Sequence, residues 1–368
     1  MGLMATLPGF TLLVVVLWDT FETVVLPRSV TRSLRLTRVF YRTSWALWSG
    51  VAKRISHGPT RDAILSFYGP LSLLMLMHVW ALCLIVAFAL IHWGLHSPLN
   101  TPDGQSGFST YLYMSGVTLF TLGFGDVVPR EMMGRALTVA EAGVGIGFLA
   151  LVIGYLPTLY QAFSRREVAI SLLDARAGSP PTAVELLRRH GIEGQQSALI
   201  MLLQEWERWA AELLESHLSF PVLLFYRSQH DRESWLAALT AMLDTCSILL
   251  QTTGSERPSS AALRWQANVT FAMCRHAVVD LALILNTPPS EDEHDRLSPE
   301  KLKRVREVLL LAGFVVNDGE AWVTLRRQYE PYLNSLSRGL MVRLPPYLPE
   351  SEMADNWQTS AWKSVRHF

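Results

Sequence analysis

The long uncharged run Ala63–Pro102 limits the folds open to this chain more than any other feature, because it contains no Lys, Arg, Asp or Glu. Its centre, Leu71–Trp93, is apolar and long enough to cross a bilayer as one helix. Tyr68 and Trp93 lie near the ends, where interfacial aromatic residues are common. The run predicts a membrane-spanning helix over residues 67–93.

A second apolar run, Ala136–Ser164, has Glu141 as its single charge and is followed at once by Arg165 and Arg166. It is again long enough to span the hydrocarbon core of a bilayer. We therefore predict a second spanning helix over residues 135–163.

The first apolar run, Leu7–Leu26, predicts an additional transmembrane helix within residues 1–27; the alternative is a partly buried or interfacial helix. It carries Asp19 and Glu22 one helical turn apart, and carboxylates inside a membrane are costly unless they have a partner. We expect a nearby arginine such as Arg28 to supply it. A secretory signal is disfavoured, since no basic residue precedes the run and no small-residue cleavage site follows it.

The distribution of charge sets the orientation in the membrane. Residues 28–62 hold eight basic residues and one acidic residue, Asp62, whereas the loop 94–107 holds only Asp103. Basic loops stay on the cytoplasmic side. We therefore expect residues 28–62 and the tail 165–368 to be cytoplasmic, and both the N-terminus and the segment between the two long spans to lie outside.

Arg32, Arg35 and Arg38 are spaced by three residues, which raises the possibility of a voltage-sensing helix. Such a sensor needs a surrounding bundle of helices, and one candidate helix precedes this segment. We favour an amphipathic helix on the inner leaflet, with its arginines toward anionic head groups. Its apolar residues would then face lipid: Leu34, Val39, Phe40, Trp45 and Trp48.

Composition excludes several function classes. The 32 Lys plus Arg balance the 32 Asp plus Glu, so the chain lacks the basic excess of a nucleic-acid-binding protein. Cys83, Cys246 and Cys274 form neither a disulfide framework nor a metal-binding pattern. The cytoplasmic residues also show no Ser-His-Asp order, metal pair or phosphate loop, and we expect neither enzymatic activity nor a cofactor.

Between the two long spans, residues 107–129 read Gly-Phe-Ser-Thr-Tyr-Leu-Tyr-Met-Ser-Gly-Val-Thr-Leu-Phe-Thr-Leu-Gly-Phe-Gly-Asp-Val-Val-Pro. This segment resembles the pore loop of the potassium channel family, whose filter has the pattern Thr-Val-Gly-Tyr-Gly-Asp after a short aromatic-rich pore helix. The resemblance is confined to residues 63–164. It implies a pore domain with an outer helix at 67–93, a pore helix at 108–118, a filter at 121–126 and an inner helix at 135–163.

The residue types in the filter fit the binding of a dehydrated K⁺ ion, which needs oxygen atoms in place of its water shell. Backbone carbonyls supply them if alternate residues leave the ordinary backbone regions, and Gly123 and Gly125 adopt positive φ without steric cost. Thr121 can add its hydroxyl at the innermost site. Asp126 would place a carboxylate at the outer mouth.

Two residues depart from the family pattern: Leu122 replaces valine and Phe124 replaces tyrosine. Neither change affects a backbone carbonyl. Phe124 lacks the phenol hydroxyl that can brace a filter, which bears on filter stability and inactivation. Potassium selectivity is the favoured interpretation, and a weakly selective cation channel is the alternative.

The surroundings of the filter point to an assembly. The pore helix would direct its negative C-terminal dipole at the ion, and Tyr113 and Thr118 on it are candidates to support the filter. One filter segment per chain cannot surround an ion, so the resemblance implies a homotetramer in the lipid bilayer. The compact one-pore layout favours a bacterial plasma membrane.

The predicted inner helix contains Gly143, Gly145 and Gly147, with Pro157 near its cytoplasmic end. Glycine and proline weaken or bend helices, which suits a hinged gate. Close packing of helices through Gly143 and Gly147 is the equally weighted alternative.

Glu141 has two readings. It can brace the filter from behind through a hydrogen bond. The interpretation we favour from sequence is that it reaches outer water or pairs with Arg130 or Arg135, because a carboxylate near a helix end finds a solvated partner at modest cost.

The tail 165–368 is long enough for a domain with its own core, and its apolar residues recur at intervals of three and four. The pattern predicts an all-helical domain, with helices near 182–190, 195–217, 232–251, 259–286 and 299–313. No nucleotide-binding strand-loop-helix unit appears in it. The gating ligand is not indicated.

Three clusters in the tail are assigned ordinary roles. Trp206, Trp209 and Trp235 are expected in the core, with a ligand cage as the alternative. His217, His230 and Asp231 lack the spacing of a metal site. Residues 291–295 are expected to form a solvated loop, because they lack the pattern of a calcium loop.

The sequence thus predicts an all-α membrane protein: a potassium-channel-like pore unit, an extra N-terminal transmembrane helix and an all-helical cytoplasmic domain. The favoured function is passive K⁺ conduction, gated or assembled by that domain. From another class, the chain could be a membrane-anchored sensor or interaction protein with a silent pore.

Overall fold

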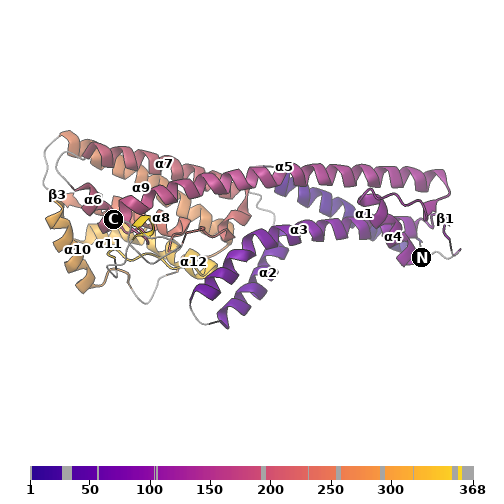
Figure 1. The fold of residues 1–368 in the computed structure, drawn as a ribbon, viewed down its shortest axis with the longest axis horizontal. Helices are drawn as coiled ribbons and strands as arrows, with labels where there is room; N and C mark the ends of the chain where they lie inside the picture. The colour runs from indigo at the N-terminus through magenta and orange to yellow at the C-terminus, as the bar shows by residue number, and fades with distance from the viewer. Residues whose placement is uncertain are drawn as a thin grey trace. The chain divides into compact units, whose positions relative to one another are not determined.

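The computed structural model describes residues 2–26, 35–55, 58–102, 104, 107–191, 196–230, 232–253, 258–290, 295–317, 319–349 and 355–358. The chain divides into two compact units, Met1–Gln161 and Ala162–Phe368. Both are mostly helical, and α5 (Met132–Ala177) belongs to both, as Figure 1 shows.

The first unit consists of helices and one small strand pair. The helices are α1 (Gly2–Thr20) with a π-helical turn at Phe21–Val25, α2 (Leu36–Lys53), α3 (Pro59–Gly94), α4 (Phe108–Leu119) and the first part of α5. Two short strands, β1 (Leu99–Asn100) and β2 (Val128–Pro129), pair antiparallel, with Leu99 opposite Pro129. This strand pair was not predicted.

Helix α3 contains the whole predicted span 67–93 but begins earlier. Its start is set by Pro59, whose fixed φ suits the first helical turn and whose missing N–H costs nothing there. The apolar run is buried on one side, where Leu76, Trp80 and Leu84 form a core with Val16 of α1 and other residues. Other residues of α3, such as Phe67, are exposed.

The N-terminal helix α1 packs along α3. Gly9 allows their close approach, because a Cβ atom at this position would lie 2.8 Å from the carbonyl oxygen of Ala87. Val16, further along α1, is fully buried. The apolar run Leu7–Leu26 therefore forms a helix that packs against the helix of the run Ala63–Pro102.

By length and composition, four helices among the described residues can cross a membrane: Met4–Val25, Thr60–Gly94, Met132–Ala177 and Ala261–Leu285. The fourth lies in the tail, and its buried residues, including Phe271, Val278 and Leu281, belong to the tail core. It also carries the charged residues Arg264, Arg275 and Asp280. Its packing accounts for its apolar character without a membrane.

The second unit is the helical tail, built on the last part of α5. Its helices are α6 (Ala183–His190), α7 (Gln196–Ser219), α8 (Trp235–Leu250), α9 (Pro258–Leu285), α10 (Pro299–Leu311), α11 (Glu320–Arg327) and α12 (Glu330–Leu340), with 3₁₀ turns at Pro221–Phe225 and Asn356–Gln358. A short strand pair joins β3 (Thr252–Thr253) to β4 (Val315–Val316). The five predicted helices are present, and α11, α12 and the strand pair are additional.

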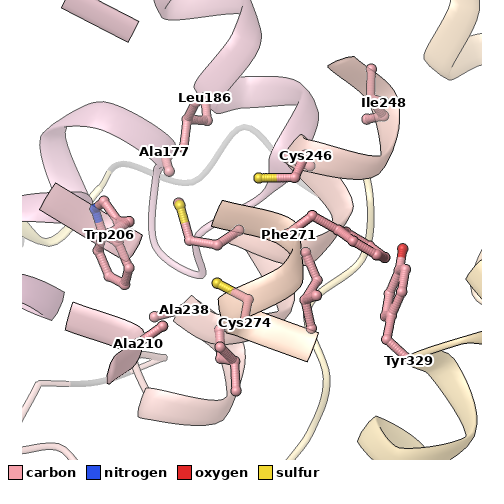
Figure 2. Packing of buried hydrophobic residues seen from close by; sticks show 14 of the residues in the cluster. Ala177, Leu186, Trp206, Ala210, Ala238, Cys246, Ile248, Phe271, Cys274 and Tyr329 are labelled. Carbon is pink, nitrogen blue, oxygen red and sulfur yellow. The ribbon is translucent and has the colours of Figure 1, made fainter. Parts of the chain in front are cut away.

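Helix α8 lies at the centre of the tail, since every residue from Trp235 to Leu249 is buried. Figure 2 shows part of this core, in which Cys246 of α8 and Cys274 of α9 lie among Trp206, Phe271 and their neighbours. Both cysteines are free thiols. The expected core position of Trp206, Trp209 and Trp235 is confirmed, because all three are buried.

A buried charge cluster ties the C-terminal part of the tail to α8. Arg296 donates hydrogen bonds to both carboxylate oxygens of Asp244, at 2.9 and 3.1 Å, and to both of Glu330, at 2.6 and 2.9 Å. Its guanidinium also lies 5.0 Å from the ring centre of Tyr347. Burial opposes the charge on Arg296, but Asp244 and Glu330 outweigh it and hold the pKa of Arg296 well above its usual value.

Two predictions about α2 need correction. Trp45 and Trp48 do not face lipid: both rings pack on Tyr68 of α3, and the Trp48 Nε1–H donates to the Ile64 carbonyl oxygen at 3.1 Å. Arg35 also does not face head groups, as described below. Aromatic residues on an amphipathic helix pack equally well on a neighbouring helix, and the sequence pattern does not distinguish the two.

Candidate functional site

Three backbone hydrogen bonds from the following residues close the C-terminal end of α4. The N–H groups of Phe120, Thr121 and Leu122 donate to the carbonyl oxygens of Gly116, Thr118 and Val117, at 3.1, 2.9 and 2.8 Å. The chain then leaves the helix at Thr121. Helix α4 covers the predicted 108–118 segment and one further residue, Leu119.

Alternate residues of the segment have left-handed backbone conformations. The φ angles are 55° at Thr121, 59° at Gly123 and 77° at Gly125, while Leu122 and Phe124 keep negative φ. A Cβ atom at either glycine would meet no atom within 4 Å in this chain, so the backbone conformation, not crowding, calls for glycine. Positive φ at Thr121 was not predicted, because a β-branched residue rarely adopts it.

The side chains of this segment have little cover within one chain. Residues 120–126 are all exposed, with Leu122 56% and Phe124 67% accessible. Exposure of two large apolar side chains within one short segment is unfavourable in water. The segment therefore presents apolar side chains that the rest of the chain does not cover.

The end of the segment is held to α4 and to the strand pair. The Tyr113 hydroxyl donates to Asp126 Oδ2 at 2.8 Å, and the Val127 N–H donates to Asp126 Oδ1 at 3.0 Å. Strand β2 follows directly, paired with β1. Asp126 is thus fixed by Tyr113, one of the residues selected from sequence.

Glu141 lies behind α4 and is fully buried. Its Oε1 atom is hydrogen-bonded to the Ser115 hydroxyl, which also lies 2.9 Å from the Ile85 carbonyl oxygen. Its Oε2 atom has no partner among the described residues. The favoured pairing with Arg130 or Arg135 is wrong; the Arg135 Nε–H instead donates to the Pro129 carbonyl oxygen at 3.2 Å.

Glycine in α5 provides a close contact with the end of α4. A Cβ atom at Gly145 would lie 2.1 Å from the Leu119 carbonyl oxygen, whereas Gly143 and Gly147 have no such neighbour within 4 Å. The alternative of packing through Gly143 and Gly147 is therefore wrong within one chain, and Gly145 takes that role. Helix α5 continues through all three glycines and through Pro157.

Asp19 and Glu22 form a buried network with α2 and α3. Asp19 Oδ2 accepts hydrogen bonds from Trp80 Nε1 at 2.9 Å and from the Thr37 hydroxyl at 2.6 Å. Arg35 Nε lies 3.9 Å from Asp19 Oδ1 and 3.4 Å from Glu22 Oε2. The expected arginine partner is thus Arg35, and the suggested Arg28 lies outside the described residues.

In the tail, the last part of α5 is held by a buried arginine. Arg166 donates to the carbonyl oxygens of Leu223 and Tyr226, at 3.0 and 2.8 Å, and its Nη1 lies 3.3 Å from His217 Nε2. The Trp209 Nε1–H donates to the Arg166 carbonyl oxygen at 3.3 Å. This anchor was missed, because nothing local distinguishes Arg166 from Arg165.

Of the three tail residues considered as metal ligands, the structure describes His217 and His230. Asp231 lies outside the described residues, as do residues 291–294 of the acidic loop. No group of three His, Cys, Asp or Glu side chains gathers in the part of the chain that the structure describes. Burial and the nearby charge of Arg166 lower the pKa of His217 to about 3, so this side chain is neutral at ordinary pH.

Residues 74–162 match a protein-family model described as an ion channel. The uncharacterized membrane protein YdjJ of Bacillus subtilis is 26% identical over 209 residues, which cover 56% of this chain and 59% of that protein. The human potassium voltage-gated channel subfamily KQT member 4 is 41% identical over 61 residues, covering 16% of this chain and 9% of that channel. Each match therefore spans less than two thirds of the relative, and no solved structure matches the chain.

The geometry and these comparisons agree at a coarse level. The chain is a mostly helical membrane protein with apolar helices long enough to span a bilayer, and residues 74–162 match an ion-channel family model.

Proposed function

We propose that this chain is one subunit of a potassium-selective channel that conducts K⁺ passively through residues 121–125. The observation that carries the proposal is the positive φ at Thr121, Gly123 and Gly125, directly after α4. In an extended strand successive carbonyls point in opposite directions. Alternation of left-handed and right-handed residues turns them to one side, where they replace the water around a K⁺ ion. The named potassium channel among the relatives favours the same ion.

The proposed channel is a homotetramer. Leu122 and Phe124 are exposed in one chain, and neighbouring subunits would cover them. Helix α5 also presents exposed apolar side chains along its length, at Ile146, Ile153, Tyr160, Val168 and Leu172. Ile146, Ile153 and Tyr160 are seven residues apart, which is the repeat expected where helices pack lengthwise on copies of themselves.

The other selected residues take supporting roles in this proposal. Asp126, held by Tyr113, carries the negative charge of the outer mouth, and the Thr118 carbonyl helps to end α4 just before the filter. Glu141 braces α4 from behind through Ser115. The C-terminal end of α4 directs its negative dipole toward the ion.

The gate is proposed to lie in α5. Gly143, Gly147 and Pro157 are points where this helix can bend, and Gly145 fixes the helix against α4. Bending at Gly147 or Pro157, which lie between Gly145 and the tail, would change the width of the pore. Backbone carbonyls of the tail accept hydrogen bonds from Arg166 of α5. Movements within the tail would therefore be transmitted to the inner helix.

The proposed orientation follows the charge distribution. The segment 28–62 and the tail 165–368 are cytoplasmic, whereas the N-terminus and the pore loop face outward. The proposed location is the plasma membrane, and the proposed partners are lipid, K⁺ and three further copies of the chain.

Replacement of the central filter glycine tests the proposal. We expect Gly123→Ala to abolish K⁺ current in planar bilayers while leaving assembly intact, because alanine at a φ of 59° is strained and shifts the carbonyls. Gly104→Ala is the matched control: Gly104 has a φ of 67°, also has no neighbour within 4 Å, and lies outside the filter. Normal current and selectivity in Gly123→Ala would refute the filter assignment.

A further inference from the structure

The tail contains a cavity that the proposed conduction pathway does not use. It has a volume of about 520 Å³ and lies between α6, α10 and the C-terminal residues 346–349. Sites for small molecules in proteins have volumes of roughly 300–1,000 Å³. The cavity is therefore large enough for a small ligand.

The lining combines an apolar base with a basic edge. Val184 and Val305 are fully buried in its wall, and Leu348 adds a further apolar surface. Three basic residues also line it: Arg188, Lys301 and Arg304. Such a lining suits a ligand with an apolar body and a negatively charged group.

The basic charge at the cavity is only partly neutralised. Lys301 and Arg304 have no ion pair among the described residues. Glu185 is the one acidic residue in the lining, and it accepts hydrogen bonds from both Arg188 and Arg189 at 2.6–2.7 Å. Burial alone would raise the pKa of Glu185, but the two arginines outweigh burial and hold that pKa below its usual value. The Glu185 carboxylate thus pairs with arginines of its own helix, α6. The net charge of the cavity lining is therefore positive.

The cavity wall is connected to the end of the inner helix. The Val184 N–H donates to the Tyr347 carbonyl oxygen at 3.2 Å, which joins α6 to the C-terminal segment. On the other side of α6, Arg189 Nη1 donates to the carbonyl oxygens of Asp174 and Ala175 in the last turn of α5, at 3.3 and 2.7 Å. A ligand that changes the spacing of α6 and α10 therefore acts on the segment that ends α5.

We propose that this cavity binds a soluble amphipathic anion, a small molecule with an apolar body and a phosphate or carboxylate group, and that its binding regulates the channel. Arginine and lysine recognise the anionic group, and the valines and Leu348 contact the body. The binding half of the proposal stands on the cavity alone, and the regulatory half rests on the proposed channel function.

Hexyl phosphate is a suitable probe, titrated calorimetrically into the full-length protein in phosphatidylcholine nanodiscs. We expect binding to the unmodified protein and at least tenfold weaker binding to Lys301→Gln/Arg304→Gln, because two attractive charges are lost. Lys303→Gln/Arg327→Gln removes two exposed charges outside the cavity and should bind as the unmodified protein does. No binding, or equal weakening in both double variants, would overturn the proposal.

Further ligands test each part of the chemistry. Hexanol and inorganic phosphate should each bind at least tenfold more weakly than hexyl phosphate, and equal affinity of either would contradict the amphipathic assignment. Displacement of hexyl phosphate by phosphatidylglycerol vesicles would contradict a soluble ligand.

The regulatory half has its own readout. Hexyl phosphate should change the open probability of the unmodified channel and not that of Lys301→Gln/Arg304→Gln; an unchanged open probability would overturn regulation. Gly123→Ala should still bind hexyl phosphate, so failure of the channel assignment and failure of the cavity assignment remain distinguishable.

Discussion

Segment 120–126 and the tail core both contain large apolar side chains, but these side chains are exposed in the segment and buried in the tail core. In the tail, α8 is buried along nearly its whole length and its neighbours close around it. In the segment 120–126, every residue is exposed, including Leu122 and Phe124. The tail completes its core within one chain, whereas segment 120–126 leaves its apolar side chains exposed, and the proposed assembly would cover them.

This difference separates two kinds of apolar sequence. Apolar residues in the tail recur at intervals of three and four and stabilise a helical domain by burial. The apolar residues beside Gly123 stand in a segment with alternating positive φ angles, and the proposed ion binding rests on this backbone. Variants in the tail should therefore change stability, and variants in the pore segment should change conduction.

The largest expected effect on stability is in the tail, at Arg296. Arg296→Ala would leave the buried carboxylate of Asp244 without its cation and remove the nearer of the two arginines beside the partly buried Glu330, and we expect a loss of about 3–5 kcal/mol in the free energy of unfolding. Denaturant unfolding of the full-length protein, followed by tryptophan fluorescence, measures it. Arg327→Ala, an exposed position in α11, is the control. Equal midpoints for the two variants would mean that the tail core does not depend on this cluster.

A smaller effect is expected at Asp19, whose partners Arg35, Thr37 and Trp80 all belong to the first unit of the same chain. Asp19→Asn keeps the size but removes the charge that Arg35, Thr37 and Trp80 surround, so we expect a loss of about 2–3 kcal/mol in thermal stability measured in detergent. Thr11→Ala, on the exposed side of α1, should leave the midpoint unchanged. If Asp19→Asn is as stable as the unmodified protein, the network does not hold α1 in place.

Gly145 tests whether α5 is fixed against α4. Gly145→Ala would place a methyl group 2.1 Å from the Leu119 carbonyl oxygen, which we expect to cost about 1–3 kcal/mol and to reduce current by displacing the filter support. Gly147→Ala, with no neighbour within 4 Å, is the matched control in one chain. A larger effect at Gly147 would assign the tight contact to the interface between subunits.

The smallest predicted effect is the pH dependence contributed by His217. Its pKa is about 3 in the folded tail, below the value near 6.5 of an unfolded histidine, so the unfolded chain binds the proton first as pH falls. Stability contributed by this group is complete above pH 6.5 and is lost progressively toward pH 3. Between pH 6.5 and 5.5 we expect a loss of about 1 kcal/mol that is absent in His217→Gln. Identical pH profiles of the two proteins would show that His217 is not buried in its neutral form.

Features set by local sequence were predictable, and features set by distant contacts were not. The membrane runs, the tail helices α6 to α10 and the positive φ of Gly123 and Gly125 follow from periodicity and from glycine chemistry. Helices α11 and α12 were missed, although their buried residues recur at helical spacing. Arg35, Ser115 and Gly145 owe their roles to residues far away in the sequence, which no local pattern reveals.

The corrections at Glu141 and at Trp45 and Trp48 have the same physical origin. Glu141 was expected to find a solvated arginine, but it is buried and hydrogen-bonded to Ser115 of the neighbouring helix α4. Trp45 and Trp48 were expected in lipid, but Tyr68 offers an aromatic partner. In both cases a neighbouring helix supplied the contact that the sequence pattern assigned to water or lipid.

The reversal potential of the purified protein in planar bilayers, under opposed K⁺ and Na⁺ gradients, tests the central claim most directly. We predict a reversal close to the K⁺ equilibrium potential, since four copies of residues 121–125 would present carbonyl oxygens to a dehydrated K⁺ ion. A reversal near zero, midway between the two equilibrium potentials, would contradict a potassium-selective filter.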